Sequence, residues 1–168
     1  MEENIHIDDI EVFHLGADRT ERTEDFMIEQ DEDSITVEAV EDALYPVQEF
    51  IDQKLLRFGY FGRDLYMIRL AVEEVFINIC SYAYQSSIGT AKISCRLDGD
   101  VSNLILKFAD SGIPFNPLEQ AEADTSGVQF MEREGGFGIH LVKKIMDKIS
   151  YEYKDGKNYL VLEKKLRT

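Results

Sequence analysis

Two glutamates and an asparagine interrupt an apolar stretch, AVEEVFINICSYAY, that covers residues 71–84. At about 100° per residue, Glu74 and Asn78 lie one helical turn apart on a single stripe, whereas Glu73 points elsewhere. The stripe places a carboxylate beside an amide oxygen, so the fold has to supply a polar partner for both groups. The pattern indicates a polar site. A Glu74 at the helix rim, solvated or paired with an arginine, is the structural alternative.

A third acid lies in the stretch FADSGIPFNP at residues 108–117. Asp110 ends an expected strand, and Gly112 allows another group to approach the backbone closely. A carboxylate at this place can accept a hydrogen bond from the exocyclic amine of adenine, while it repels the carbonyl oxygen of guanine. The stretch predicts adenine in preference to guanine, with an ordinary Asp-Ser-Gly turn as the alternative.

Three glycines lie at the start of the last expected helix, in EGGFGIH. Gly135, Gly136 and Gly138 leave backbone N–H groups free to meet a phosphate at the positive end of the helix dipole. Glycines also cap and turn chains, which is a purely structural alternative. The chain contains no G-x-x-x-x-G-K-[ST] P-loop, no G-x-G-x-x-G dinucleotide motif and no H-R-D or D-F-G signature of protein kinases.

Hydrophobic periodicity predicts the elements that must position these residues. Their order predicts an α+β fold, a two-layer sandwich in which helices cover one face of a mostly antiparallel sheet. The expected elements are a strand at 34–40, a helix from Val40 to a break at Gly59, a helix at 63–84, a hairpin of strands 91–97 and 102–109, a polar loop at 115–135, a helix at 138–149, and a hairpin formed by SYEYK and NYLVLEKKL.

The acidity of the chain is concentrated in its first part. Residues 1–33 contain 13 acidic residues and 2 arginines, so they hold −11 of the net charge of −15. This balance argues against nucleic acid as a partner and suits a basic protein surface. We expect 1–33 to form a solvated extension and 34–168 to form one domain. Within the extension, an apolar set could form a short added strand: Ile10, Val12, Phe13 and Leu15.

Composition limits the remaining classes of protein. No apolar stretch approaches the roughly 20 residues that cross a bilayer, and the acidic start lacks the pattern of a secretory signal. We therefore expect a cytoplasmic protein without a membrane partner. Cys80 and Cys95 are too isolated for a zinc site and fit reduced thiols.

Three stretches of the chain resemble, in order, the N, G1 and G2 boxes of the GHKL ATPase superfamily, which has the Bergerat nucleotide-binding fold. These stretches are EVFIN, DSGIP and GGFGIHLVKKIMD. Residues 34–166 resemble its small stand-alone anti-sigma factor serine kinases. The resemblance implies ATP and Mg²⁺ under a mobile lid, and transfer of the γ-phosphate to a serine of an anti-sigma factor antagonist. A bound sigma factor and a homodimer are further expectations from this resemblance.

The resemblance also implies a role for each matching residue. Glu74 is expected to act as general base and Asn78 to hold Mg²⁺, with 115–135 as the lid. Tyr82 stands where a histidine is frequent in the family, and Val161 where many members carry a threonine near adenine. The other cofactor-binding residues implied are Asp110, Gly112 and Pro114 for adenine and Gly135, Gly136 and Gly138 for the phosphates.

Two other functions fit the same boxes. A histidine kinase catalytic domain shares them, but this chain lacks the helix hairpin with a phosphoacceptor histidine. A non-catalytic module, in which ATP orders the lid and so controls the binding of a partner protein, is the stronger alternative. The presence of both Glu74 and Asn78 favours chemistry, because the binding of adenine requires neither.

Overall fold

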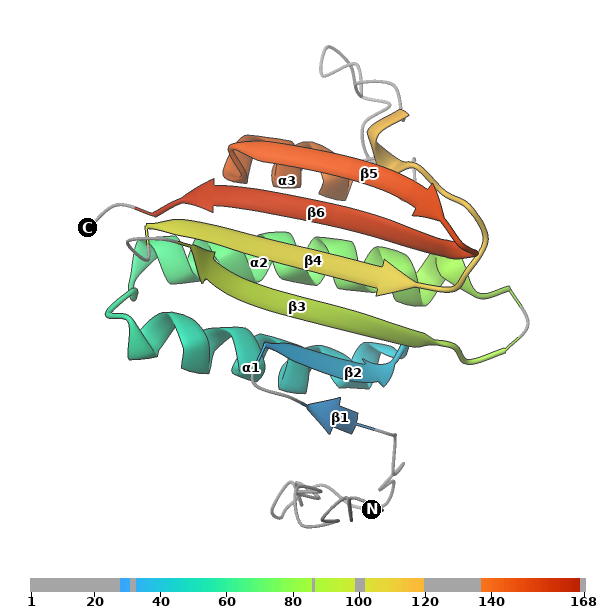
Figure 1. The fold of residues 1–168 in the computed structure, drawn as a ribbon, viewed down its shortest axis with the longest axis horizontal. Coiled ribbons are helices and arrows are strands. Elements are labelled where there is room, and N and C mark those ends of the chain that lie inside the picture. The colour runs from blue at the N-terminus through green and yellow to red at the C-terminus, as the bar shows by residue number, and fades with distance from the viewer. Residues whose placement is uncertain (1–27, 31–32, 86, 99–101, 120–136, 167–168) are drawn as a thin grey trace, which may run out of the picture.

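The computed structural model describes residues 28–30, 33–85, 87–98, 102–119 and 137–166, which form two layers (Figure 1). One layer is a six-stranded antiparallel sheet in the order β1-β2-β3-β4-β6-β5. The predicted α+β sandwich is confirmed. The strands are β1 (Ile28–Gln30), β2 (Ser34–Glu38), β3 (Thr90–Asp98), β4 (Asn103–Asp110), β5 (Lys148–Lys154) and β6 (Lys157–Lys165).

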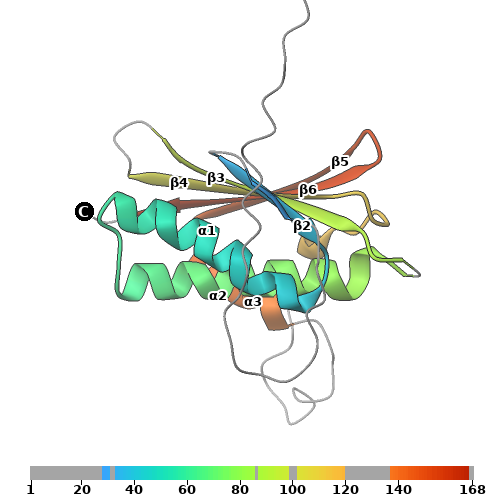
Figure 2. The same cartoon turned by 90° about the horizontal axis from the view of Figure 1, so that it is seen from below.

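The helices form the second layer, and Figure 2 shows the α-helices of the described residues on the same face of the sheet. The expected helix at 63–84 is confirmed, but its last turns are a π-helix, a feature that often marks functional sites. The helical elements are η1 (Glu41–Ala43), α1 (Leu44–Arg57), α2 (Arg63–Asn78), the π-helix η2 (Ile79–Ala83), η3 (Pro117–Glu119) and α3 (Phe137–Ile145).

Strand alternation explains how the two layers hold together. Along β3 and β4, alternate side chains such as Ile93, Leu106 and Phe108 are fully buried against the helices. From the other layer, Val72 and Phe76 of α2 pack into the same core with no exposed surface. The stretch that was expected to be a helix bearing Glu74 is therefore fixed along the middle of the sheet.

The prediction that a single helix covers 138–149 is wrong. The helix α3 ends at Ile145, and the N–H of Asp147 already donates to the carbonyl of Glu163 in β6. Ile149 pairs with Leu162 as part of β5. Because Ile145 and Ile149 stand four residues apart, the strand continues the apolar spacing of the helix by coincidence.

The first strand falls inside the segment that was expected to be an extension. β1 pairs with β2 at the edge of the sheet, with Ile28 opposite Val37. The proposed strand around Ile10 lies outside the described residues, and the division at residue 33 stays a prediction. Within the described part of the chain, no helix is long and apolar enough to cross a membrane.

Candidate functional site

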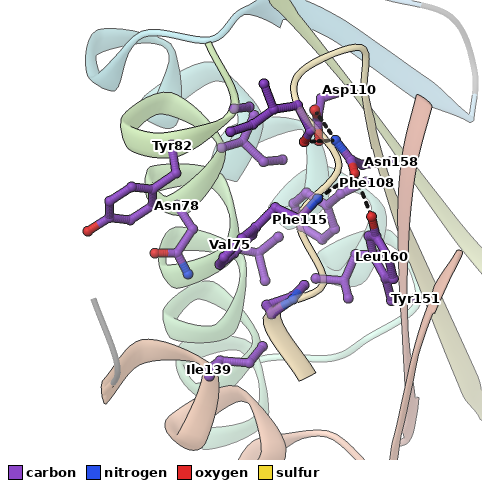
Figure 3. A pocket seen from close by; sticks show the side chains of 14 residues that line it. Val75, Asn78, Tyr82, Phe108, Asp110, Phe115, Ile139, Tyr151, Asn158 and Leu160 are labelled. Carbon is purple, nitrogen blue, oxygen red and sulfur yellow. Dashed lines mark hydrogen bonds between the residues drawn. The ribbon is translucent and has the colours of Figure 1, made fainter. Parts of the chain in front are cut away.

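A pocket opens between the two layers at one end of the molecule (Figure 3). Asn78 and Tyr82 reach it from the end of α2 and from η2, Asp110 from the end of β4, and Asn158 from the start of β6. Its cavity volume is about 50 Å³.

Asp110 is buried in the pocket wall, with 8% of its surface exposed. Its Oδ1 accepts hydrogen bonds from the N–H of Gly112 at 2.9 Å and from Nδ2 of Asn158 at 2.8 Å. Among the described residues, nothing donates to Oδ2. Asp110 can therefore both form the Asp-Ser-Gly turn and bind a ligand, because the turn uses one carboxylate oxygen and leaves the other for the ligand.

Asn158 is a central residue of the pocket that the sequence analysis missed. Its Nδ2 donates to Asp110 and to the carbonyl of Ile113, while its Oδ1 accepts from the hydroxyl of Tyr151 and the N–H of Phe115. These four bonds use its full capacity and fix the Asp110 carboxylate in place. One signal could have found it, since Asn158 is a polar residue on the inward, otherwise apolar side of a strand.

The loop after β4 is held against the end of the helix layer. The N–H of Ile113 donates to the carbonyl of Ala83, and a Cβ on Gly112 would lie 2.4 Å from that carbonyl oxygen. The hydroxyl of Tyr84 accepts from the N–H of Ser111 and donates to the carbonyl of Thr90. The close approach expected at Gly112 is therefore to the protein's own backbone. Pro114 is exposed and does not line the pocket.

Glu74 lies against the first turn of α3. A Cβ on Gly138 would come within 2.1 Å of Glu74 Oε2, so only a glycine leaves room for the carboxylate as it stands. Burial raises the pKa of Glu74, and the charge of Glu73 adds to this effect. A raised pKa makes the carboxylate a stronger proton acceptor. Glu73 is exposed, as the helical spacing predicted.

Asn78 lines the pocket one turn after Glu74 and is half-buried. Figure 3 shows its amide projecting from the helix on the side away from Asp110. The amide makes no hydrogen bond with any residue that the structure describes. Gly135, Gly136 and most of the expected lid lie outside the described residues. The described start of the lid contains a short helix, η3, and Asn116 lies just before it. The Oδ1 of Asn116 accepts from the N–H of Leu118, and its Nδ2 donates to Glu119.

The chain matches the family model of the histidine kinase-like ATPase domain over residues 20–164. It belongs to this family. The predicted GHKL relationship is thereby confirmed, and the motifs at Glu74, Asp110 and Gly138 lie around one end of the sandwich.

The chain is also similar to curated protein kinases. Over 129 residues the chain is 28% identical to the serine/threonine-protein kinase BtrW of Bordetella bronchiseptica, a match that covers 77% of this chain and 87% of the relative. It is 26% identical over 102 residues to the serine-protein kinase RsbW of Halalkalibacterium halodurans, covering 60% of this chain and 62% of the relative. It is 28% identical over 109 residues to RsbW of Bacillus cereus, covering 62% and 67%.

Two departures from the family pattern can now be placed. Tyr82 stands at the mouth of the pocket, 42% exposed, with its ring centroid 6.4 Å from that of Phe115. The placement of Val161 beside adenine is wrong, because Val161 pairs with Lys107 and Ser150 and does not line the pocket. Asn158 and Leu160, on the inward side of the same strand, line it instead.

Proposed function

We propose that this chain is an ATP-dependent serine kinase that transfers the γ-phosphate of ATP to a serine of an anti-sigma factor antagonist. The observation that carries the proposal is the contact between Glu74 and Gly138. It places a carboxylate of raised pKa at the start of α3, where a helix N-terminus attracts phosphate. A proton acceptor beside bound phosphates is the arrangement that phosphotransfer to a hydroxyl requires.

The described residues fit a nucleotide. Oδ2 of Asp110 has no hydrogen bond from the described residues, and we infer that it accepts from the exocyclic amine of adenine. Gly112 and Asn158 hold the carboxylate for this task. Tyr82 and Phe115, an aromatic pair at the mouth of the pocket, can cover the face of the base.

The residues also fit Mg²⁺, since carboxamide oxygens are suitable ligands for this ion and the Asn78 amide has no hydrogen-bond partner among the described residues. Bound Mg²⁺ would neutralise the charge that develops on the phosphates. Glu74 takes the proton of the attacking serine hydroxyl, and the serine oxygen bonds to the γ-phosphorus. The bond from the γ-phosphorus to the oxygen bridging the β-phosphate breaks, and ADP leaves with its electrons.

The serine acceptor is proposed from the relatives, which are named as serine or serine/threonine kinases. The anti-sigma factor antagonist is proposed from the resemblance of the N, G1 and G2 boxes. A bound sigma factor, a homodimer and a cytoplasmic location stay predictions. The distinguishing experiment captures partner proteins from the native cell on the full chain and supplies ATP labelled at the γ-phosphate. We expect Mg²⁺-dependent label on a serine of a captured protein. Binding of ATP without any transfer would leave the ATP-gated binding module as the function.

A further inference from the structure

The sheet face turned away from the helices is covered by no helix or strand of the described chain (Figure 2). We call the outward side chains of β2 to β6 the open face. Strand alternation gives this face seven basic side chains and four acidic ones. In a chain with a net charge of −15, an excess of positive charge on one face is unexpected.

The centre of the open face is apolar. Ile105, Tyr159 and Val161 lie there on β4 and β6 and are half-buried. Lys107 extends over Tyr159, with its ammonium 4.3 Å from the ring centroid. An apolar centre with basic side chains around it is a surface suited to a segment that carries both apolar and acidic residues.

Some basic side chains on this face form an ion pair with a described residue, and others do not. Lys148 pairs with Glu163 at 2.7 Å, and Arg96 lies 3.9 Å from Asp98. Lys154 and Lys157, in contrast, stand directly opposite each other at the end of the β5 and β6 pair. Like charges that face each other across strands destabilise a sheet unless a counter-charge is near.

The chain itself contains a segment with the complementary chemistry. Residues 1–27 hold nine acidic residues and two arginines, with apolar residues such as Ile5, Ile7 and Ile10 between them. The segment leads into β1, which is the edge strand of the same sheet. Extended, 27 residues reach about 90 Å. The sheet is only roughly 25 Å wide at about 4.8 Å per strand, so the segment can cross it.

We propose that residues 1–27 dock on the open face of their own chain, with acidic side chains against the basic ones and apolar side chains on the centre around Val161. The nucleotide pocket lies on the other side of the sheet, between the sheet and the helices. Docking therefore leaves the pocket open, and it does not depend on the proposed kinase activity.

Limited trypsin digestion of the full chain tests this proposal. Arg19 and Arg22 are the basic residues of the segment, so cleavage after them reports whether the segment is accessible. Reversal of two charges on the open face, Arg96→Glu with Lys107→Glu, should speed this cleavage roughly threefold to tenfold, since each exposed ion pair contributes little by itself. The matched control is Arg57→Glu with Lys143→Glu, which makes the same charge change at exposed positions of the helix layer.

Equal cleavage rates in the two double variants would overturn the proposal. Circular dichroism checks that both variants fold. If the reversal variant unfolds, the milder pair Arg96→Gln with Lys107→Gln supplies the same comparison with a smaller expected increase. Cleavage of the wild type should not change over a hundredfold range of protein concentration. Protection that increases with concentration would mean that the segment docks on a second copy, which also contradicts docking within one chain.

Discussion

The two ends of the candidate site are built differently. Around Asp110, buried groups hold one another through a closed set of hydrogen bonds centred on Asn158. Around Glu74, a half-buried carboxylate lies against Gly138 and makes no hydrogen bond or ion pair with the described residues. The first end is fixed before a ligand arrives, while the Glu74 carboxylate keeps bonding capacity that no described residue uses.

The difference suggests a division of tasks. A rigid carboxylate can select one base over another, because a wrong donor pattern leaves it unsatisfied at full cost. A carboxylate with room around it can take up a proton and release it again. Changes at the Glu74 end should therefore affect rate more than affinity, and changes at the Asp110 end should affect affinity and stability.

The largest effect is expected for Glu74→Gln. This change keeps the shape of the side chain but removes the proton acceptor, so phosphotransfer should fall by roughly 10² to 10⁴ while ATP still binds. Single-turnover transfer of labelled phosphate to the serine partner, with ATP affinity measured alongside, is the test. The exposed neighbour supplies the control, since Glu73→Gln should change the rate little. Full activity in Glu74→Gln would remove the catalytic role.

The pH profile of the same reaction should follow the raised pKa of Glu74. The base works only when ionised, so the rate should fall as the pH drops through a value above the ordinary 4.5. Burial is the larger cause of the shift and Glu73 the smaller. The acidic limb should therefore move slightly to lower pH in Glu73→Gln. An acidic limb at or below the ordinary glutamate value would contradict the assignment.

The same shift has a consequence for stability. The folded state holds the Glu74 proton more tightly than the unfolded chain, so this contribution to stability is present below pH 4.5 and is lost as the pH rises through the raised value. Glu74→Gln should remove this dependence. Thermal melts of the wild type and Glu74→Gln between pH 4 and 8 test this, because the difference between their melting temperatures should grow with pH.

At the other end, Asp110→Asn should cost ATP binding about 1.5 to 3 kcal/mol, the value of a hydrogen bond to a charged group. Calorimetry with ATP and GTP checks this. The wild type should prefer ATP, and the variant should lose much of that preference. Equal affinity of the wild type for the two nucleotides would show that Asp110 does not contact adenine.

Asn158→Ala should weaken both binding and folding, because it removes one hydrogen bond each from Asp110, Tyr151 and the N–H of Phe115. We expect a loss of about 1 to 3 kcal/mol in the free energy of unfolding, measured by urea titration. Tyr151→Phe is the matched control. It removes one of the four bonds and should cost about 1 kcal/mol. An unchanged unfolding midpoint in Asn158→Ala would show that the hydrogen-bond set contributes nothing to stability.

Some residues of the candidate site could be placed from the sequence, because the pattern of nearby residues in the chain determines where their side chains point. Glu74 and Asn78 share a helical stripe, and Asp110 ends an alternating strand, so local periodicity placed these side chains, while their roles were inferred from the resemblance of the three boxes. Asn158 meets Asp110 across 48 positions, and only the pairing of β4 with β6 brings them together. Val161 was misplaced for the same reason, because the face to which a strand residue points depends on register.

The overall fold was predictable because alternation and turn residues agree with it. The last hairpin is an example, since Asp155 and Gly156 both adopt positive φ, of 52° and 77°, as a two-residue turn requires. The end of α3 was not predictable, because Ile149 extends the helical spacing while the sheet takes it as a strand residue. Hydrogen bonds to β6 stabilise the strand over the helix in this segment.

The smallest loss of stability is expected for Gly138→Ala, and its comparison with Gly112→Ala separates the two ends of the site directly. At Gly112 a methyl group would meet the Ala83 backbone oxygen at 2.4 Å, which cannot move without shifting the π-helix. We expect a loss of stability of about 1 to 3 kcal/mol there. At Gly138 the methyl group would meet the end of the flexible Glu74 side chain, which can turn aside. Stability should then change by less than about 1 kcal/mol.

The displaced Glu74 carboxylate should nevertheless slow phosphotransfer in Gly138→Ala, because a small misplacement of a reacting group reduces rate sharply. Urea titration and single-turnover kinetics on both variants give the test. If Gly138→Ala loses as much stability as Gly112→Ala and keeps its rate, then the Glu74 end is as rigid as the Asp110 end. The proposed contrast between a rigid Asp110 end and an adaptable Glu74 end would then be wrong.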